Sequence, residues 1–259
     1  MGVKQLFNLD GKVALITGGS RGLGFTMAEA LGEMGARVAL VARKADELEI
    51  ARASLAAQGI DCMVVAADLA QPATIARIVE RVLDPWGQID ILVNNAGANW
   101  AAPAEDYPDE GWRKVMALNV DAQFALSREV GKRTMIPRRT GKIVNVASIA
   151  GLFGNPPAWQ MQTIAYNTSK GALVNFTRAL AAEWGRYNIN VNAICPGFFP
   201  SKMTKTLLER IDRAVIDLTP LGRLGSDDDL KGSVVFLASE ASRHITGQAL
   251  VVDGGCTIV

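Results

Sequence analysis

Tyr166 and Lys170 have the side chains and the spacing of an acid–base pair. They are four residues apart, so on a helix both side chains project from the same face. A ketone that accepts a hydride becomes an alkoxide, and a site that reduces it must supply a proton and stabilise the developing charge. A tyrosine can supply that proton when a nearby lysine ammonium lowers its pKa from about 10. Such pairs are also common on ordinary helices, so other residues must support this interpretation.

A glycine-rich loop follows the first apolar run of the chain. It reads Thr17-Gly18-Gly19-Ser20-Arg21-Gly22-Leu23-Gly24. Its glycines let the backbone turn tightly and approach a pyrophosphate without a Cβ in the way. The helix expected after the loop offers free N–H groups and a partial positive charge to that anion. Because the loop lies between a predicted strand and a predicted helix, it indicates a dinucleotide site rather than an ordinary turn.

Seven short apolar runs alternate with stretches of helical spacing such as Ala45–Gln58 and Thr74–Leu83. The runs are Lys12–Ile16, Arg37–Ala42, Cys62–Ala66, Ile89–Val93, Lys142–Val146, Asn190–Ile194 and Ala249–Val252. Their apolarity is continuous rather than alternating, which indicates strands buried on both faces. The alternation predicts an α/β doubly wound Rossmann fold, with a single parallel seven-stranded sheet and helices on both faces. No linker or charge block divides the chain, so we predict one domain over residues 1–259.

Two segments, at about 149–164 and 198–223, interrupt this alternation of predicted strands and helices. Each follows the carboxyl end of a predicted strand, where open α/β sheets bind ligands, so both are candidate substrate walls or lids. The alternative is a surface insertion with a small core of its own. Their apolar residues favour an acyl or aryl ketone over a free sugar: they are Leu152, Phe153, Trp159, Met161, Phe198, Phe199 and Met203. Lys202, Lys205 and Arg210 either meet a carboxylate or phosphopantetheine carrier at the rim or are solvated helix charges.

The composition excludes several classes of function. With 27 basic and 26 acidic side chains, no global field attracts nucleic acid or an anionic membrane. No apolar run approaches the ~18 residues of a membrane span, and the first residues lack the apolar core of a signal peptide. Three distant cysteines indicate a reduced, cytoplasmic protein. A single histidine, His244, excludes histidine-rich metal sites, and we expect no metal.

The glycine spacing, Gly-x-x-x-Gly-x-Gly, resembles that of the short-chain dehydrogenase/reductase family. Further motifs follow in that family's order, and together they cover nearly the whole chain. They are Asn94-Asn95-Ala96-Gly97, Asn119, Ser148, Tyr166-Asn-Thr-Ser-Lys170, Pro196-Gly197 and Asp253-Gly254-Gly255. One departure is visible, because Ser148 and Tyr166 are 18 residues apart, whereas the family more often has about a dozen residues between them. The extra length falls in Pro-Pro-Ala-Trp-Gln-Met-Gln, where it would reshape the pocket.

The resemblance implies a role for each residue of the site. Tyr166 would donate the proton, and Lys170 would bind the nicotinamide ribose and lower the tyrosine pKa. Ser148 would bond the substrate carbonyl, and Asn119 would hold a water that links Lys170 to solvent. Besides Tyr166 and Lys170, the cofactor would contact Gly18, Ser20, Arg21, Gly22, Leu23, Gly24, Arg43, Asp68, Leu69, Asn95, Ala96, Gly97, Pro196 and Gly197. The family also implies a homotetramer.

The residues at the end of the second predicted strand favour NADP(H) over NAD(H). NAD-dependent Rossmann proteins place an acidic residue there to bind the ribose 2′-hydroxyl, but this chain has Ala42 followed by Arg43. Guanidinium groups match a 2′-phosphate well, and Arg21 supplies a second one. Asp46 and Glu47 could soften the preference, and the two arginines could instead be solvated.

Two subfamilies remain open for the substrate, a small-molecule ketone or alcohol. The stretch from Pro196 to Thr204 is similar to that of 3-oxoacyl reductases. The same stretch and the opening residues 6–11 also resemble gluconate 5-dehydrogenases. We favour the 3-oxoacyl or a related ketone. A non-catalytic dinucleotide sensor would be expected to lose Tyr166 or Lys170, and a hydrolase using Ser148 would depend on His244, which the resemblance places elsewhere.

Overall fold

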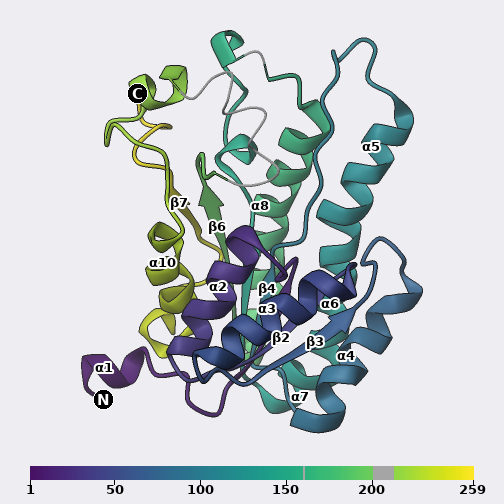
Figure 1. Cartoon of the computed structure of the whole chain (residues 1–259), viewed down its shortest axis with the longest axis vertical. Coiled ribbons are helices and arrows are strands. Elements are labelled where there is room, and N and C mark those ends of the chain that lie inside the picture. The colour runs from purple at the N-terminus through teal and green to yellow at the C-terminus, as the bar shows by residue number, and fades with distance from the viewer. Residues whose placement is uncertain (160, 201–212) are drawn as a thin grey trace.

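Seven parallel strands form one sheet in the order β3-β2-β1-β4-β5-β6-β7 (Figure 1). The computed structural model describes residues 1–159, 161–200 and 213–259. The strands are β1 Val13–Thr17, β2 Arg37–Ala42, β3 Cys62–Ala66, β4 Ile91–Asn94, β5 Gly141–Val146, β6 Ile189–Pro196 and β7 Ala249–Val252. The predicted fold class is confirmed, and β2, β3 and β7 have the predicted bounds.

The predicted fourth strand begins two residues too early, because Asp90 has another role. Its carboxylate accepts a hydrogen bond from the backbone N–H of Val13 at 2.9 Å and from the Arg138 guanidinium at 2.8 Å. These bonds fasten the amino ends of β1 and β4 together, and the ladder between the two strands starts at Ile91.

Helices cover both faces of the sheet (Figure 1). They are α1 Val3–Leu6, α2 Gly22–Glu33, α3 Ala45–Ala57, α4 Ala73–Trp86, α5 Asp109–Met116, α6 Ala122–Val130, α7 Ile136–Arg138, α8 Ile164–Trp184 and α10 Asp228–Ala238. α2, α3 and α10 pack on one face, and α4, α6 and α8 on the other. Within the described ranges, no helix has the length and apolarity needed to cross a bilayer.

Strand β1 shows why its sequence is apolar from Val13 to Ile16. Leu15 and Ile16 are neighbours whose side chains point to opposite faces, and neither is exposed to solvent. Ile16 belongs to the core that includes Met27 of α2, whereas Leu15 belongs to the core that includes Val79 of α4. Both faces of the sheet are therefore buried at β1, as the continuous apolar runs predicted.

Strand β1 is also where the order of the sheet reverses. It pairs with β2 on one side and with β4 on the other, so the connections on its two sides lead away in opposite directions. In doubly wound sheets the crevice outside the carboxyl ends of the strands at such a switch point binds ligands. The glycine-rich loop follows β1 and Asn95 follows β4, so both lie at this crevice.

Candidate active site

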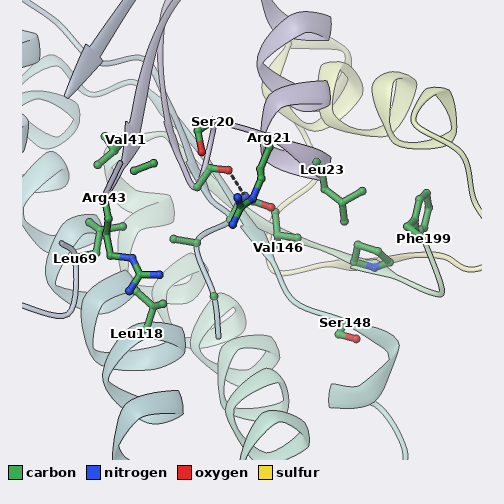
Figure 2. Close-up of a pocket in the computed structure, with 18 of the residues that line it drawn as sticks. Ser20, Arg21, Leu23, Val41, Arg43, Leu69, Leu118, Val146, Ser148 and Phe199 are labelled. Atoms are coloured by element: carbon green, nitrogen blue, oxygen red, sulfur yellow. Dashed lines mark hydrogen bonds between the residues drawn. The ribbon is translucent and has the colours of Figure 1, made fainter. Parts of the chain in front are cut away.

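A cavity of about 480 Å³ opens at the carboxyl ends of the strands (Figure 2). Arg43 and Leu69 lie at one end of it, and Ser148 and Phe199 lie at the other (Figure 2). Every position predicted to contact a cofactor lines the cavity, from Gly18 to Gly197. Residues that the sequence did not single out for this site also line it: Val41, Lys44, Ala67, Leu118, Val146 and Ala147. Most of these residues are adjacent in sequence to predicted positions, and this adjacency is the sequence signal that could have identified them.

The floor of the cavity is backbone rather than side chain. Gly18 has a φ of +65°, and a Cβ at Gly24 would overlap the carbonyl of Gly18 and the side chain of Asn95. The Asn95 amide donates to the carbonyl oxygen of Thr17 at 2.9 Å, which ties the loop to the end of β4. The first turn of α2 therefore lies close to the residue that follows β4 and lines the cavity, the position in which a helix N-terminus can bind a pyrophosphate.

A short turn carries Ser148 toward α8. Two residues after β5, its hydroxyl accepts a hydrogen bond from the backbone N–H of Ala150 at 3.1 Å, which caps the 3₁₀ turn Ile149–Gly151. A Cβ at Gly151 would press on the backbone of Lys170, so glycine lets the turn lie directly on the helix. This contact brings Ser148 to the cavity wall beside Tyr166 although 18 residues separate them.

Burial shifts the pKa values of Tyr166 and Lys170 in opposite directions. It lowers the pKa of Lys170 from 10.5 to about 8. It also raises the pKa of Tyr166, an effect that the Ser148 hydroxyl partly offsets. The Lys170 ammonium lies 5.5 Å from the centroid of the tyrosine ring and donates to the carbonyl oxygen of Val146 at 2.7 Å. The expectation of a lowered tyrosine pKa is therefore wrong for this state of the protein, because desolvation by burial raises the pKa by more than the Ser148 hydrogen bond lowers it.

Asn119 differs from its predicted setting. It lies in a π-helical segment, Ala117–Asp121, between α5 and α6. It is fully buried and does not line the cavity. Its amide donates to the carbonyl oxygen of Ala98 at 3.0 Å and to the Ser169 hydroxyl at 2.9 Å, and its side-chain oxygen accepts from the N–H of Ala98 at 2.8 Å. The side chain thus fastens the loop after β4 to α8.

A charged cluster lines the end of the cavity next to β2. The Arg21 guanidinium donates to both carboxylate oxygens of Glu47, at 2.8 and 2.9 Å, and Lys44 reaches the same carboxylate at 3.0 Å. Arg43 extends into the space beside them (Figure 2) and bonds to none of the described residues. The sequence identified the two arginines and noted Glu47, but not that Glu47 binds Arg21.

The aromatic residues of the two predicted wall segments mostly pack against each other. Trp159 is 2% exposed and contacts Phe153 and Phe198 edge-on, with ring centroids 5.9 and 5.2 Å apart. Met161 joins this cluster, whereas Leu152 is exposed. Phe199 alone of the described wall candidates lines the cavity. The other described rings of these segments contact one another instead of this cavity, and the role of the two segments as substrate walls stays a prediction. Met203, Lys202, Lys205 and Arg210 lie outside the described residues.

No described residue supports a serine hydrolase at this site. The cavity lining contains Ser148 but no histidine within the described ranges, and His244 is exposed. The Ser148 hydroxyl accepts a hydrogen bond from the backbone N–H of Ala150, and no histidine of the described lining is present to accept its proton. The arrangement instead places a hydroxyl, a phenol and an ammonium group at one end of a long cavity with a glycine floor.

Comparison with known proteins gives full-length matches. The sequence model of the family described as enoyl-(acyl carrier protein) reductase matches residues 18–257. The chain is 38% identical to a gluconate 5-dehydrogenase of Gluconobacter oxydans, over 98% of each chain. It is also 38% identical to a rhamnolipids biosynthesis 3-oxoacyl-[acyl-carrier-protein] reductase of Pseudomonas aeruginosa, over 96% of this chain and 97% of that one.

Among solved structures, a gluconate 5-dehydrogenase from Burkholderia cenocepacia in complex with NADP and tartrate has a TM-score of 0.93. It is 33% identical to this chain, and the match covers 100% of both. The similarity therefore extends over the cavity and over both segments that flank it.

Proposed function

The chain belongs to the short-chain dehydrogenase/reductase family, and we propose that its cavity binds NADP(H) and interconverts a ketone and a secondary alcohol. The observation that carries this proposal is the continuity of one cavity from Arg21 and Arg43 at one end to Ser148, Tyr166 and Lys170 at the other. A dinucleotide is a long molecule with a phosphate-bearing ribose at one end and the reactive ring at the other, and it fits such a site.

The residues present fit NADP(H). The glycine floor beside Gly24 leaves the close backbone approach that a pyrophosphate needs. Arg21, Arg43 and Lys44 line the end where a ribose 2′-phosphate would lie. The structure of the Burkholderia relative contains NADP. When bound, the cofactor supplies or accepts a hydride.

Tyr166 is the proton donor in this proposal. The phenol is protonated at neutral pH, because an ordinary tyrosine pKa is about 10 and burial raises the pKa of Tyr166 further. The hydroxyl can therefore give its proton to the oxygen of a ketone as negative charge develops there. The Ser148 hydroxyl donates a hydrogen bond to the same oxygen. Lys170 binds the ribose hydroxyls with the ammonium that now bonds the Val146 carbonyl. Asn119 fastens the loop after β4 to α8, the helix that carries Lys170.

A ketone-reduction assay tests this function. NADPH is mixed with a panel of ketones, and the loss of absorbance of the reduced nicotinamide is followed. Tyr166→Phe removes only the hydroxyl, so NADPH affinity should persist while turnover falls by about 10² or more. Near wild-type turnover of this variant would contradict the role of Tyr166.

For the substrate, we propose a 3-oxoacyl compound or a related apolar ketone. Among the described residues of the cavity wall, Lys170 is the only cation outside the cluster next to β2, so no dedicated partner for a sugar-acid carboxylate lies near Ser148. The segments after β5 and β6 that flank this end are joined through Trp159 and Phe198. An apolar chain can lie along such a surface without leaving hydroxyls unpaired.

A sugar acid is the second candidate, and two observations favour it. The Gluconobacter relative is named a gluconate 5-dehydrogenase, and residues 201–212, outside the described part, contain Lys202, Lys205 and Arg210. Assays with 3-oxoacyl thioesters, gluconate and 5-ketogluconate separate the two. A higher kcat/KM for the sugar acids, lost when the three cations are replaced by alanine, would decide for the second candidate.

We also propose a cytoplasmic homotetramer. Exposed apolar residues on α5, α6 and α8, namely Trp112, Phe124 and Ile164, give these helices surface that a second copy could cover. The three cysteines are unpaired, consistent with a reducing compartment. Light scattering at micromolar concentration should give four times the chain mass, and a monomer mass would contradict the assembly.

A further inference from the structure

Glu47 lies at the end of the cavity next to β2, where it is the counter-ion of the cations that line this end. It lies in the first turn of α3, and its carboxylate joins Arg21 from the loop after β1 to Lys44 at the start of α3. The side chain of Glu47 is 24% exposed, whereas those of Arg21 and Lys44 are 51% and 60% exposed. The carboxylate of Glu47 is therefore the most buried member of the cluster, and the two cations lie on its solvent side.

This ion pair uses one of the guanidinium nitrogens with which Arg21 could bind a phosphate. A single nitrogen of Arg21, Nη1, donates to both oxygens of Glu47. This nitrogen cannot also bind a phosphate oxygen, and the ion pair fixes the direction in which the rest of the guanidinium group points. Arg43 bonds to none of the described residues and remains available. A phosphate monoester carries a charge of about −2, and a carboxylate a few ångströms away repels it in a partly buried site. Glu47 therefore opposes a phosphate both by occupying Arg21 and by its own charge.

We propose that Glu47 is an internal counter-ion that the ribose 2′-phosphate must displace from Arg21, and that this exchange sets the affinity for the phosphorylated cofactor. The inference rests on the proposed function, because it takes the β2 end of the cavity as the ribose-phosphate subsite. Arg43 makes the first contact with the incoming phosphate. Arg21 then exchanges one anion for another, so its charge is never left unpaired. The carboxylate limits how tightly NADP(H) is held without providing any contact specific to it.

The inference is tested by binding two small probes that differ only in the phosphate. Calorimetry measures the Kd of adenosine 2′,5′-bisphosphate and of 5′-AMP for the wild type, Glu47→Gln and Asp46→Asn. Asp46 is the matched control, because it neighbours Glu47 in the same turn, is exposed, and does not line the cavity. Both variants remove one negative charge, but only one of them frees Arg21. Glu47→Asp, whose shorter side chain withdraws from Arg21, is a second variant.

Glu47→Gln should bind the bisphosphate about tenfold more tightly and bind 5′-AMP as the wild type does. Glu47→Asp should change in the same direction by less, and Asp46→Asn should differ little from the wild type. Unchanged or weaker bisphosphate binding by Glu47→Gln would overturn the inference, and so would an equal gain for 5′-AMP or for the Asp46 variant. If the wild type binds neither probe, the dinucleotide site itself is refuted, and the proposed function fails with the inference.

Discussion

The ammonium of Lys170 lies over the ring of Tyr166, 5.5 Å from its centroid, and donates its hydrogen bond to the Val146 carbonyl rather than to the phenol. Burial favours the neutral form of both groups, since it raises the pKa of the tyrosine and lowers that of the lysine. The protein therefore holds the phenol protonated and keeps an ammonium at a site that disfavours its charge. The phenol therefore carries the proton that ketone reduction needs, while burial makes it a weaker acid than an exposed tyrosine.

Replacing Lys170 with methionine should stabilise the protein while it disables the site. The drop of the lysine pKa from 10.5 to about 8 corresponds to roughly 3 kcal/mol of stability lost at neutral pH. Below pH 8 the lysine is protonated in both the folded and the unfolded chain, and the full cost applies. Between about pH 8 and 10.5 only the unfolded chain holds the proton, so the stability of the wild type rises with pH.

Denaturant unfolding of the wild type and Lys170→Met at several pH values measures this effect. The variant should be more stable by roughly 3 kcal/mol at pH 7, and the difference should shrink toward zero by pH 10.5. Its turnover should fall sharply at every pH. Lys142→Met is the control for activity, because Lys142 is a buried lysine of β5 that does not line the cavity. A Lys170→Met variant that is less stable than the wild type would show that the buried ammonium does not destabilise the protein.

Cofactor choice should depend on Ala42 and Arg43. The wild type should prefer NADPH to NADH in kcat/KM by about 30-fold or more, because charge-assisted bonds to a phosphate contribute ~1.5–3 kcal/mol each. Replacing Ala42 with Asp and Arg43 with Ser should reverse that order, since the new carboxylate accepts from a ribose hydroxyl and repels a phosphate. Arg43→Ala alone should raise the KM for NADPH and leave that for NADH nearly unchanged. Equal use of both cofactors by the wild type would refute the assignment.

Much of the fold could be predicted because it depends on short-range patterns. The strand Arg37–Ala42 is an apolar run that ends where charged residues begin, so its bounds follow from composition. The positions that line the cavity follow from the topology, since the carboxyl ends of β1, β2 and β4 must meet at the switch point. Residues such as Gly18, Arg43 and Asn95 could thus be assigned to one site from their places after strands.

What the sequence did not reveal depends on side chains that meet across the fold. Arg21 and Glu47 are 26 residues apart in the chain, and no periodicity links a loop after β1 to a turn of α3. A local case is Asn155, whose amide donates to the Met161 carbonyl and to the Thr163 hydroxyl, both at 3.0 Å. These bonds close the extra residues before α8 into a loop, and the irregular spacing of the segment did not predict them. The direction of the Tyr166 pKa shift depends on burial, which spacing alone does not give.

The contact between Gly151 and Lys170 should be as important for activity as the side chains it positions. Gly151→Ala adds one methyl group, and a Cβ there would press on the backbone of Lys170 and the N–H of Gly171. The turn must then move away from α8 and carry the Ser148 hydroxyl with it. A displacement of about 1 Å in a catalytic group lowers rates by about 10²-fold. Gly154→Ala is the matched control, since a Cβ at Gly154 meets nothing within 4 Å.

The two variants should differ in kcat far more than in cofactor affinity. The turnover of Gly151→Ala should fall by about 10- to 100-fold. Its free energy of unfolding should be lower than that of the wild type by roughly 1–3 kcal/mol, as in other overpacked sites. Its NADPH affinity should remain near that of the wild type, because the glycine floor beside Gly24 is untouched. Gly154→Ala should match the wild type in all three measurements. Wild-type turnover in Gly151→Ala would show that Ser148 does not depend on this turn for its position.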